Sequence, residues 1–392
     1  MIGCTKLLCG TATVSEVMKH NEEGKVPANL LQFSEINRPL VVWNMTNRCN
    51  LFCKHCYIDA EDRRYKNELT TEEAREFISD LGKMQVPVLL FSGGEPLLRD
   101  DIFELGKLAA EKGLRPVISS NGTLIDDAKA KKIRESGFQY VGISIDGVEE
   151  THDEFRNQKG AFKKALEGIR ACLDNGIKTG IRFTVNKYNM ADLPVILELV
   201  EREKIPRFCM YHLVYAGRGK SMADMDTSTQ EKREILNFII SKTVELFQKG
   251  VEVEILTTDN HADGIFLLNH IRQKEPGRAD EIIKLLNMHG GCSAGTKFAN
   301  VDASGNVHPC QFWQDYTIGN VREKPFSRVW NSDDELLMKL REKEKHVKGK
   351  CGICTYKSLC GGCRIRAREV YGDIWAEDPA CYLIEEERKG EI

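Results

Sequence analysis

The sequence predicts an α/β protein in which a partial (β/α)6, TIM-like barrel is followed by a separate cysteine-rich C-terminal domain. Three observations lead to this fold class. Short apolar runs alternate with longer helical patterns between about residues 39 and 214, turn-forming and small polar residues follow several of these runs, and the cysteines gather in two groups. These changes divide the chain into an N-terminal segment (1–38), the barrel (39–220), bridging helices (221–288) and the cysteine-rich domain (289–392).

The barrel is predicted from six strand-like runs rich in β-branched residues, at 39–45, 86–91, 115–119, 140–145, 179–185 and 207–214. Helical patterns lie between them. One runs from Thr71 to Met84 behind the capping pair Thr70 and Glu73, and another from Ala161 to Asn175 ends before Gly176. Repeated strand–helix units favour a parallel sheet with right-handed crossovers. The periodicity is equally compatible with a doubly wound sheet.

The remaining elements follow Ser221. A long helix is predicted over 229–249, a short strand over 251–256 and a helix over 279–289. A hairpin is predicted from strands at 297–301 and 306–310, joined by the turn at 302–305. Beyond Gly349 we expect loops that cysteines hold in place.

Composition limits the function classes. The 392 residues carry a formal net charge of −3, which does not favour a nucleic-acid partner, and no apolar run reaches the ~18 residues that a membrane span needs. The first residues lack the basic start and apolar core of a secretory signal. We therefore expect a soluble cytoplasmic protein, in which the grouped cysteines serve metal clusters rather than disulfides, while Cys4, Cys9, Cys172 and Cys209 lie outside the groups.

The first cysteine group is Cys49, Cys53 and Cys56, spaced C-x3-C-x2-C directly after the first predicted strand. Three thiolates on one loop suit an iron–sulfur cluster and leave one iron without a protein ligand. Such an iron can bind a second, reactive molecule. Zinc is the alternative, although a structural zinc site usually has four protein ligands.

Polar motifs follow the next three predicted strands. Two glycines allow close backbone approach and a glutamate can pair with an ammonium group, while short polar side chains suit a ribose or a carboxylate. These candidate cofactor-binding residues are Gly93, Gly94 and Glu95 after the second strand, Ser119 and Asn121 at the third, Ser144 and Asp146 at the fourth, and Arg156 beyond it.

Together the C-x3-C-x2-C loop and these strand-end motifs resemble the radical SAM superfamily. The resemblance implies a [4Fe-4S] cluster on Cys49, Cys53 and Cys56 whose free iron chelates S-adenosylmethionine (AdoMet). It further implies that the Gly-Gly-Glu-Pro motif meets the methionine amino group and Arg156 its carboxylate. A low-potential donor such as ferredoxin or flavodoxin would supply the electron. Beyond the cluster ligands, no protein base or nucleophile is required to start the reaction.

The second cysteine group resembles the SPASM extension of radical SAM enzymes, which carries two auxiliary iron–sulfur clusters. The resemblance assigns Cys351, Cys354, Cys360 and Cys381 to one cluster, and Cys292, Cys310 and Cys363 to three irons of the other. The gap between Cys360 and Cys363 is two residues, where three are usual. The set of Cys292, Cys310 and Cys363 lacks a fourth ligand, and His289 lies close to Cys292 in sequence. Zinc bound by the C-x2-C pairs is the alternative.

Nearly the whole chain resembles the 12,18-didecarboxysiroheme deacetylases of the alternative heme pathway. The resemblance includes Met1-Ile-Gly3, Lys6-Leu7, Leu30 to Ser34 and Arg38 to Thr46. It implies an iron tetrapyrrole substrate that loses two acetate side chains, through a 5′-deoxyadenosyl radical, to give iron-coproporphyrin III. The alternative is a SPASM-type maturase that modifies a peptide or protein, but the first 38 residues are too few for a separate peptide-binding domain.

A substrate with many carboxylates requires cations near the strand ends, and an iron tetrapyrrole can take an axial ligand. The candidate cations are Arg182, Arg218 and Lys220, each of which can also be an ordinary solvated charge. The candidate axial ligands are His20, His212 and His289, and for His212 a packed, hydrogen-bonded role is an equal alternative.

Overall fold

The structure is a computed structural model and describes residues 1–11 and 38–391. The expectations for His20 and for Leu30 to Ser34 lie outside the described residues. No helix of the described residues is long and apolar enough to cross a membrane.

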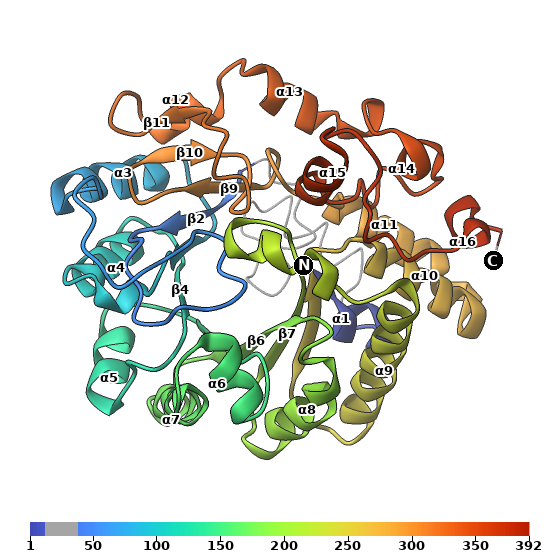
Figure 1. The fold of residues 1–392 in the computed structure, drawn as a ribbon, viewed down its shortest axis with the longest axis horizontal. Helices are drawn as coiled ribbons and strands as arrows, with labels where there is room; N and C mark the ends of the chain where they lie inside the picture. The colour runs from blue at the N-terminus through green and yellow to red at the C-terminus, as the bar shows by residue number, and fades with distance from the viewer. Residues whose placement is uncertain (12–37, 392) are drawn as a thin grey trace.

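One curved, largely parallel sheet organises the molecule (Figure 1). Its core is β2 (Leu40–Asn44), β3 (Leu89–Ser92), β4 (Pro116–Ser120), β5 (Val141–Ser144), β6 (Thr179–Val185), β7 (Arg207–His212) and β8 (Glu254–Thr258). These strands pair in parallel in chain order, and β9 (Phe298–Val301) pairs in parallel with the outer side of β2. The predicted parallel α/β fold is confirmed, and all six predicted barrel strands are present.

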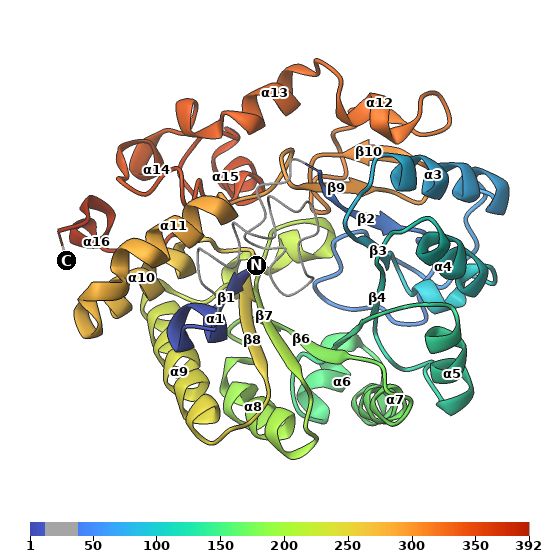
Figure 2. The ribbon, with the colours of Figure 1, turned by 180° about the vertical axis from the view of Figure 1, so that it is seen from behind.

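The sheet stays open. At one edge β1 (Ile2–Gly3) runs antiparallel to β8, as Figure 2 shows, and at the other β10 (Asn306–His308) and β11 (Gly319–Asn320) extend β9 as an antiparallel meander. Among the described residues no ladder joins β1 to β11. The sheet therefore curves around a central space without closing a barrel. The short strand expected among bridging helices is β8, and it belongs to the main sheet.

Helices cover the outer face of the sheet (Figures 1 and 2). They are α3 (Thr71–Lys83), α4 (Ile102–Glu111), α5 (Asp127–Glu135), α6 (Glu150–Arg156), α7 (Ala161–Asp174), α8 (Leu193–Arg202) and α9 (Thr229–Gln248). The predicted capping box of α3 forms between Thr70 and Glu73, and Gly176 takes a left-handed φ of 71° after α7. These local signals explain why the predicted ends of both helices lie within one residue of those in the structure.

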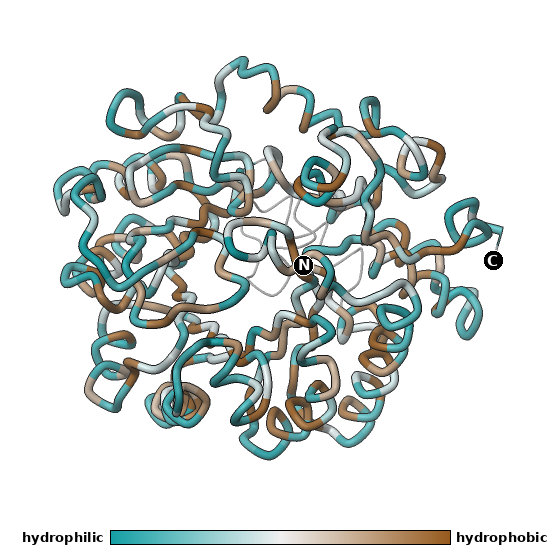
Figure 3. The backbone as a smooth tube through the Cα atoms, viewed as in Figure 1, coloured by the Kyte–Doolittle hydropathy of each residue, from teal (hydrophilic) through white to brown (hydrophobic). Residues whose placement is uncertain are grey.

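Alternating strand residues separate the core from the central space. Trp43 of β2 is fully buried and packs on Phe77 of α3 and Phe91 of β3, with ring centroids 5.6 and 5.7 Å away. Leu90 and Val117 belong to a smaller apolar cluster on the opposite face. Figure 3 shows hydrophobic residues along the strands and inner helix faces, and hydrophilic ones around the periphery. One face of the sheet thus forms the core, and the other is free to line a cavity.

The remaining helices lie beside β8 and over the cysteine-rich region. They are α1 (Cys4–Cys9), α10 (Ala262–Lys274), α11 (Ala279–His289), α12 (Phe326–Trp330), α13 (Glu335–Arg341), α14 (Gly349–Ile353), α15 (Arg364–Tyr371) and α16 (Glu385–Lys389). The loops expected beyond Gly349 are therefore partly wrong, because three short helices form there. Tertiary contacts support them: Arg366 of α15 is fully buried in an ion pair with Asp378. The division at residues 38, 220 and 288 stays a prediction.

Candidate active site

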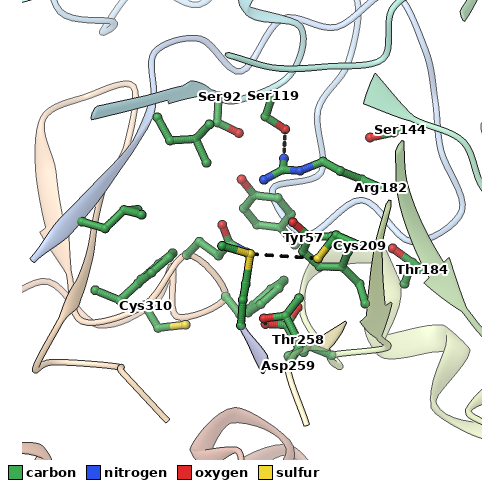
Figure 4. A pocket seen from close by; sticks show the side chains of 18 of the residues that line it. Tyr57, Ser92, Ser119, Ser144, Arg182, Thr184, Cys209, Thr258, Asp259 and Cys310 are labelled. Atoms are coloured by element: carbon green, nitrogen blue, oxygen red, sulfur yellow. Dashed lines mark hydrogen bonds between the residues drawn. The ribbon is translucent and has the colours of Figure 1, made fainter. Parts of the chain in front are cut away.

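A cavity of about 460 Å³ fills the concave side of the sheet. Figure 4 shows side chains from successive strands around it, and the labelled ones include Ser92, Ser119, Ser144, Thr184, Cys209 and Thr258. The loop of Cys49, Cys53 and Cys56 borders this cavity, and Cys292 and Cys310 border it from the C-terminal region. The two predicted cysteine centres therefore face one shared space.

Each sulfur of the first loop accepts at least one N–H group, and Cys49 Sγ also accepts from Asn121 Nδ2 at 4.0 Å. The backbone N–H of Leu51 donates to Cys49 Sγ over 3.4 Å, that of Ala60 to Cys56 Sγ over 3.4 Å, and Arg156 Nη1 to Cys53 Sγ over 3.4 Å. Burial raises the pKa of Cys49 to about 12, and the neighbouring Glu95 and Cys53 add to the shift. Thiols in such surroundings become thiolates when bound metal cations supply the positive charge.

The Gly-Gly pair after β3 positions this loop. A Cβ on Gly93 would lie 2.3 Å from Thr46 O, and one on Gly94 would lie 2.2 Å from Arg48 O. In that tight packing Gly94 N donates to Thr46 O over 2.7 Å. Only glycine fits at these two positions, since any side chain would displace the backbone that leads into Cys49. Sequence reasoning gave these glycines a role beside the cofactor and missed their packing role.

Glu95 lies behind the cavity wall. Its carboxylate is fully buried and accepts from Ser120 Oγ at 2.9 Å, Asn121 N at 2.8 Å and Leu97 N at 3.3 Å. Burial raises the pKa of Glu95 to about 7, although these donors oppose the shift. In this arrangement Glu95 fixes the turn after β4, where Asn121 Nδ2 in turn donates to Asn50 Oδ1 at 2.9 Å.

Asp146 also lies behind the wall and holds Arg156. The guanidinium of Arg156 pairs with Asp146, whose Oδ1 accepts from Thr184 N at 2.6 Å. Burial alone would raise the pKa of Asp146, but Arg156 brings it below its usual value. Arg156 thus connects β5 to Cys53. The structure places the other candidates in the cavity wall: Gly93, Gly94, Ser119, Asn121, Ser144 and Arg156.

The auxiliary cysteines form two electrostatic groups. Burial raises the pKa of Cys310 well above its usual value, and the thiols of Cys292 and Cys363 raise it further. Burial does the same for Cys360, where the contributing thiols are Cys381 and Cys351.

The pKa of Cys351 is also raised: burial is the largest cause, and the nearby thiol of Cys354 adds to the shift. These neighbours match the grouping that the family resemblance implies, and the assignment of the cysteines to two clusters stays a prediction.

A buried ion pair lies between the two groups. Arg366 Nη2 and Asp378 Oδ2 are 2.8 Å apart, and both side chains are almost fully buried. Asp378 Oδ2 also accepts from Cys363 N at 2.7 Å, while Asp378 N donates to Cys351 Sγ at 3.4 Å. Asp378 therefore touches one cysteine of each group. Nothing in the sequence pattern singled out either residue, because the pair depends on tertiary packing.

Two of the three candidate cations line the cavity. Arg182 donates to Ser119 Oγ, and Arg218 Nε donates to Cys53 O over 2.8 Å, so Arg218 also supports the first loop. Lys220 is half-exposed and pairs with Glu369 at 3.1 Å, away from the cavity lining. The structure adds Arg38, Arg115 and Arg207, which precede or begin strands and were not predicted.

The donor set fits iron–sulfur clusters. All ligand candidates are cysteine sulfurs, the type that such clusters prefer, and the first loop presents three. Gly93, Gly94 and Ser144 line the same cavity, where a bound molecule would lie. Among residues 1–11 and 38–391, no three His, Cys, Asp or Glu side chains converge to hold a single metal ion.

Two family models match the chain. Residues 43–200 match the radical SAM superfamily, and residues 292–355 match the SPASM iron–sulfur cluster-binding domain. The first range contains the C-x3-C-x2-C loop and the strand-end motifs, and the second contains four of the auxiliary cysteines, Cys292, Cys310, Cys351 and Cys354.

Relatives cover nearly the whole chain. It is 49% identical to Fe-coproporphyrin III synthase of Methanosarcina barkeri, over 99% of this chain and 98% of that protein. It is 44% identical to pre-heme d1 synthase of Dinoroseobacter shibae, over 88% and 86%. The fold is also that of Streptococcus suis SuiB bound to S-adenosylmethionine, with a TM-score of 0.70, 20% identity and coverage of 88% and 78%. The chain belongs to the radical SAM superfamily, in the group with a SPASM domain, and is an enzyme that uses AdoMet and [4Fe-4S] clusters.

Proposed function

We propose that this enzyme converts 12,18-didecarboxysiroheme to iron-coproporphyrin III by removing two acetate side chains. The observation that carries the proposal is the 49% identity, over 99% of the chain, to a protein named Fe-coproporphyrin III synthase. An identity of this size across both cysteine-bearing regions supports a shared substrate class.

The charge of the cavity supports a substrate with several carboxylates. Among the described residues, seven cationic side chains line it, against the two carboxylates of Glu254 and Asp259. The cations are Arg38, Arg115, Arg156, Arg182, Arg207, Arg218 and Lys297. Burial lowers the pKa of Arg115, and the nearby Arg207 lowers it further, so an incoming carboxylate would relieve this repulsion. Arginine suits carboxylate binding because its planar guanidinium can donate two parallel hydrogen bonds to one carboxylate.

The chain's own residues hold the reactants and keep water out. When bound, AdoMet and the reduced cluster supply a 5′-deoxyadenosyl radical, which takes a hydrogen atom from the substrate. Cys49, Cys53 and Cys56 fix the cluster at the cavity wall, and Arg218 and the Gly-Gly pair fix their loop. Tyr57 packs edge-on against Phe312 at a centroid distance of 5.4 Å, so the first loop contacts the auxiliary region. Both rings also line the cavity.

The electron is proposed to come from a low-potential ferredoxin or flavodoxin in the cytoplasm. The first cysteine loop reaches the surface at Phe52, which is 48% exposed, and at the exposed Lys54. Phe52 directly precedes Cys53, and Lys54 directly follows it. A donor protein that docks there would approach the first cluster closely.

Mass spectrometry of the tetrapyrrole after a single incubation tests the proposal. Anaerobic enzyme with all clusters, AdoMet, reductant and 12,18-didecarboxysiroheme should yield iron-coproporphyrin III and 5′-deoxyadenosine. Unchanged tetrapyrrole from enzyme that still cleaves AdoMet would remove this substrate and favour the peptide-modifying alternative.

A second candidate product is pre-heme d1, since the chain is 44% identical to a protein named for that synthesis. The same incubation tests both candidates, because the mass spectrum identifies the tetrapyrrole that is formed. Iron-coproporphyrin III alone supports the first proposal.

A further inference from the structure

We propose that His261 is the axial ligand of the substrate's iron, which seats the tetrapyrrole beside the auxiliary cysteines. This inference rests on the proposed function only in requiring an iron tetrapyrrole. His261 would bind the iron of the substrate, whereas the cysteine motifs are expected to bind the protein's own iron–sulfur clusters.

His261 lines the cavity from the turn between β8 and α10. It is the residue before α10, and Asp259 and Asn260 separate it from the end of β8. The preceding Asn260 is buried, donates from Nδ2 to Ala380 O over 3.0 Å and accepts from Ala262 N at 3.2 Å. Asp259 before it holds a left-handed φ of 68°, a strained conformation that local contacts must maintain. The turn is thus tied to the segment that carries Cys381, which limits the positions open to the imidazole.

Among the described residues, the other cavity histidines have competing contacts. His55 stacks on Phe155 at 4.6 Å, and His212 Nε2 lies 2.9 Å from Asp263 Oδ2. His289 Nε2 lies 3.3 Å from the Met1 amine, and its Nδ1 is buried without a partner.

His261 differs from all three. Within residues 1–11 and 38–391 no hydrogen bond involves its ring, which remains partly exposed, and its ring centroid is 5.6 Å from that of His289. Sequence reasoning overlooked His261, although it named His212 and His289.

The chemical state of the ring suits iron. Burial lowers the pKa of His261 well below its usual value, and nearby cationic groups, including Lys343 and Arg366, reinforce the shift. A neutral imidazole keeps a nitrogen lone pair, and histidine is a common axial ligand of heme iron. Cys292, three residues beyond His289, lines the same part of the cavity. An iron tetrapyrrole bound through His261 would therefore face the auxiliary group of Cys292, Cys310 and Cys363.

Spectroscopy of bound iron(III)-coproporphyrin III tests the proposal. The fully loaded wild-type enzyme, without reductant, is compared with His261→Ala, His261→Gln and His270→Ala. His270 lies on α10, the helix that follows His261, but not in the cavity lining, so its variant is the matched control. We expect histidine-ligated iron in electron paramagnetic resonance and Soret difference spectra of wild type and His270→Ala. Both His261 variants should lose this signature, and added imidazole should restore it in His261→Ala.

Affinity provides a second measurement. Loss of the iron–nitrogen bond should weaken binding of the iron porphyrin by about tenfold, and should leave binding of metal-free coproporphyrin III unchanged. An unaltered spectrum in folded His261→Ala or His261→Gln, or the absence of histidine ligation in wild type, would overturn the proposal. Product formation is assayed separately. Product formation without a His261-dependent signature would reject His261 as the iron ligand and keep the proposed function. A His261-dependent signature without product formation would reject the proposed function alone.

Discussion

Arg156 Nη1 donates to Sγ of Cys53 over 3.4 Å while the same guanidinium pairs with the fully buried Asp146. The guanidinium on α6 thereby links the middle cysteine of the first loop to Asp146, which follows β5. Hydrogen bonds to cluster sulfurs raise the reduction potential, so Arg156 contributes to tuning as well as to position.

Removing Arg156 should destabilise the protein strongly. Arg156→Met leaves the carboxylate of Asp146 buried without its partner, and the loss of unfolding free energy should be about 3–5 kcal/mol. Anaerobic urea denaturation measures this loss. The double variant Asp146→Asn/Arg156→Gln should recover much of it, since no unpaired charge remains. Strictly additive effects of the single substitutions would show that the two residues are not coupled.

Gly94→Ala should disturb the first cluster specifically. The added Cβ would lie 2.2 Å from Arg48 O, so the backbone before Cys49 must shift. Iron analysis should fall from about twelve to about eight irons per chain, because the two auxiliary clusters remain. Gly277→Ala is the matched control, since a Cβ there meets nothing within 4 Å. Full iron content in Gly94→Ala would contradict the packing role.

The raised pKa of Glu95 predicts a pH-dependent stability. Between pH 4.5 and about 7 the folded protein keeps a proton on Glu95 that the unfolded chain has released. The contribution of Glu95 to the unfolding free energy should therefore fall as pH rises through this window, by about 3 kcal/mol in all. Urea denaturation without AdoMet, compared with Glu95→Gln, isolates this dependence. Parallel pH profiles for the two proteins would argue against a raised pKa.

The auxiliary cysteines should fall into two groups by iron loss. Cys360→Ala and Cys381→Ala should each lose the same cluster, about four irons, and Cys310→Ala should lose the other. Cys172→Ala, at a buried cysteine outside both groups, should keep all irons. Electron paramagnetic resonance of the reduced variants identifies which cluster is missing. If Cys310→Ala and Cys360→Ala lost the same signal, the division of the auxiliary cysteines into two groups would be wrong.

The sequence predicted the parts of this protein that local chemistry determines. Alternating apolar strands, the Thr70–Glu73 capping box and the cysteine spacing each depend on neighbouring residues, and the structure has the corresponding strands, helix start and cysteine-lined cavity. It could not show that β8 joins the sheet, because a short apolar run does not specify its partner. The pair Arg366–Asp378 and the cavity position of His261 likewise arise from residues that only the tertiary fold brings together.

The most direct test of the central claim measures 5′-deoxyadenosine and tetrapyrrole product together in wild type and Cys53→Ala. Wild type supplied with AdoMet, reductant and 12,18-didecarboxysiroheme should form iron-coproporphyrin III with one 5′-deoxyadenosine for each acetate lost. Cys53→Ala should form neither, while keeping about eight of about twelve irons. Product formed by Cys53→Ala, or wild-type product without 5′-deoxyadenosine, would contradict radical chemistry at the first cysteine loop.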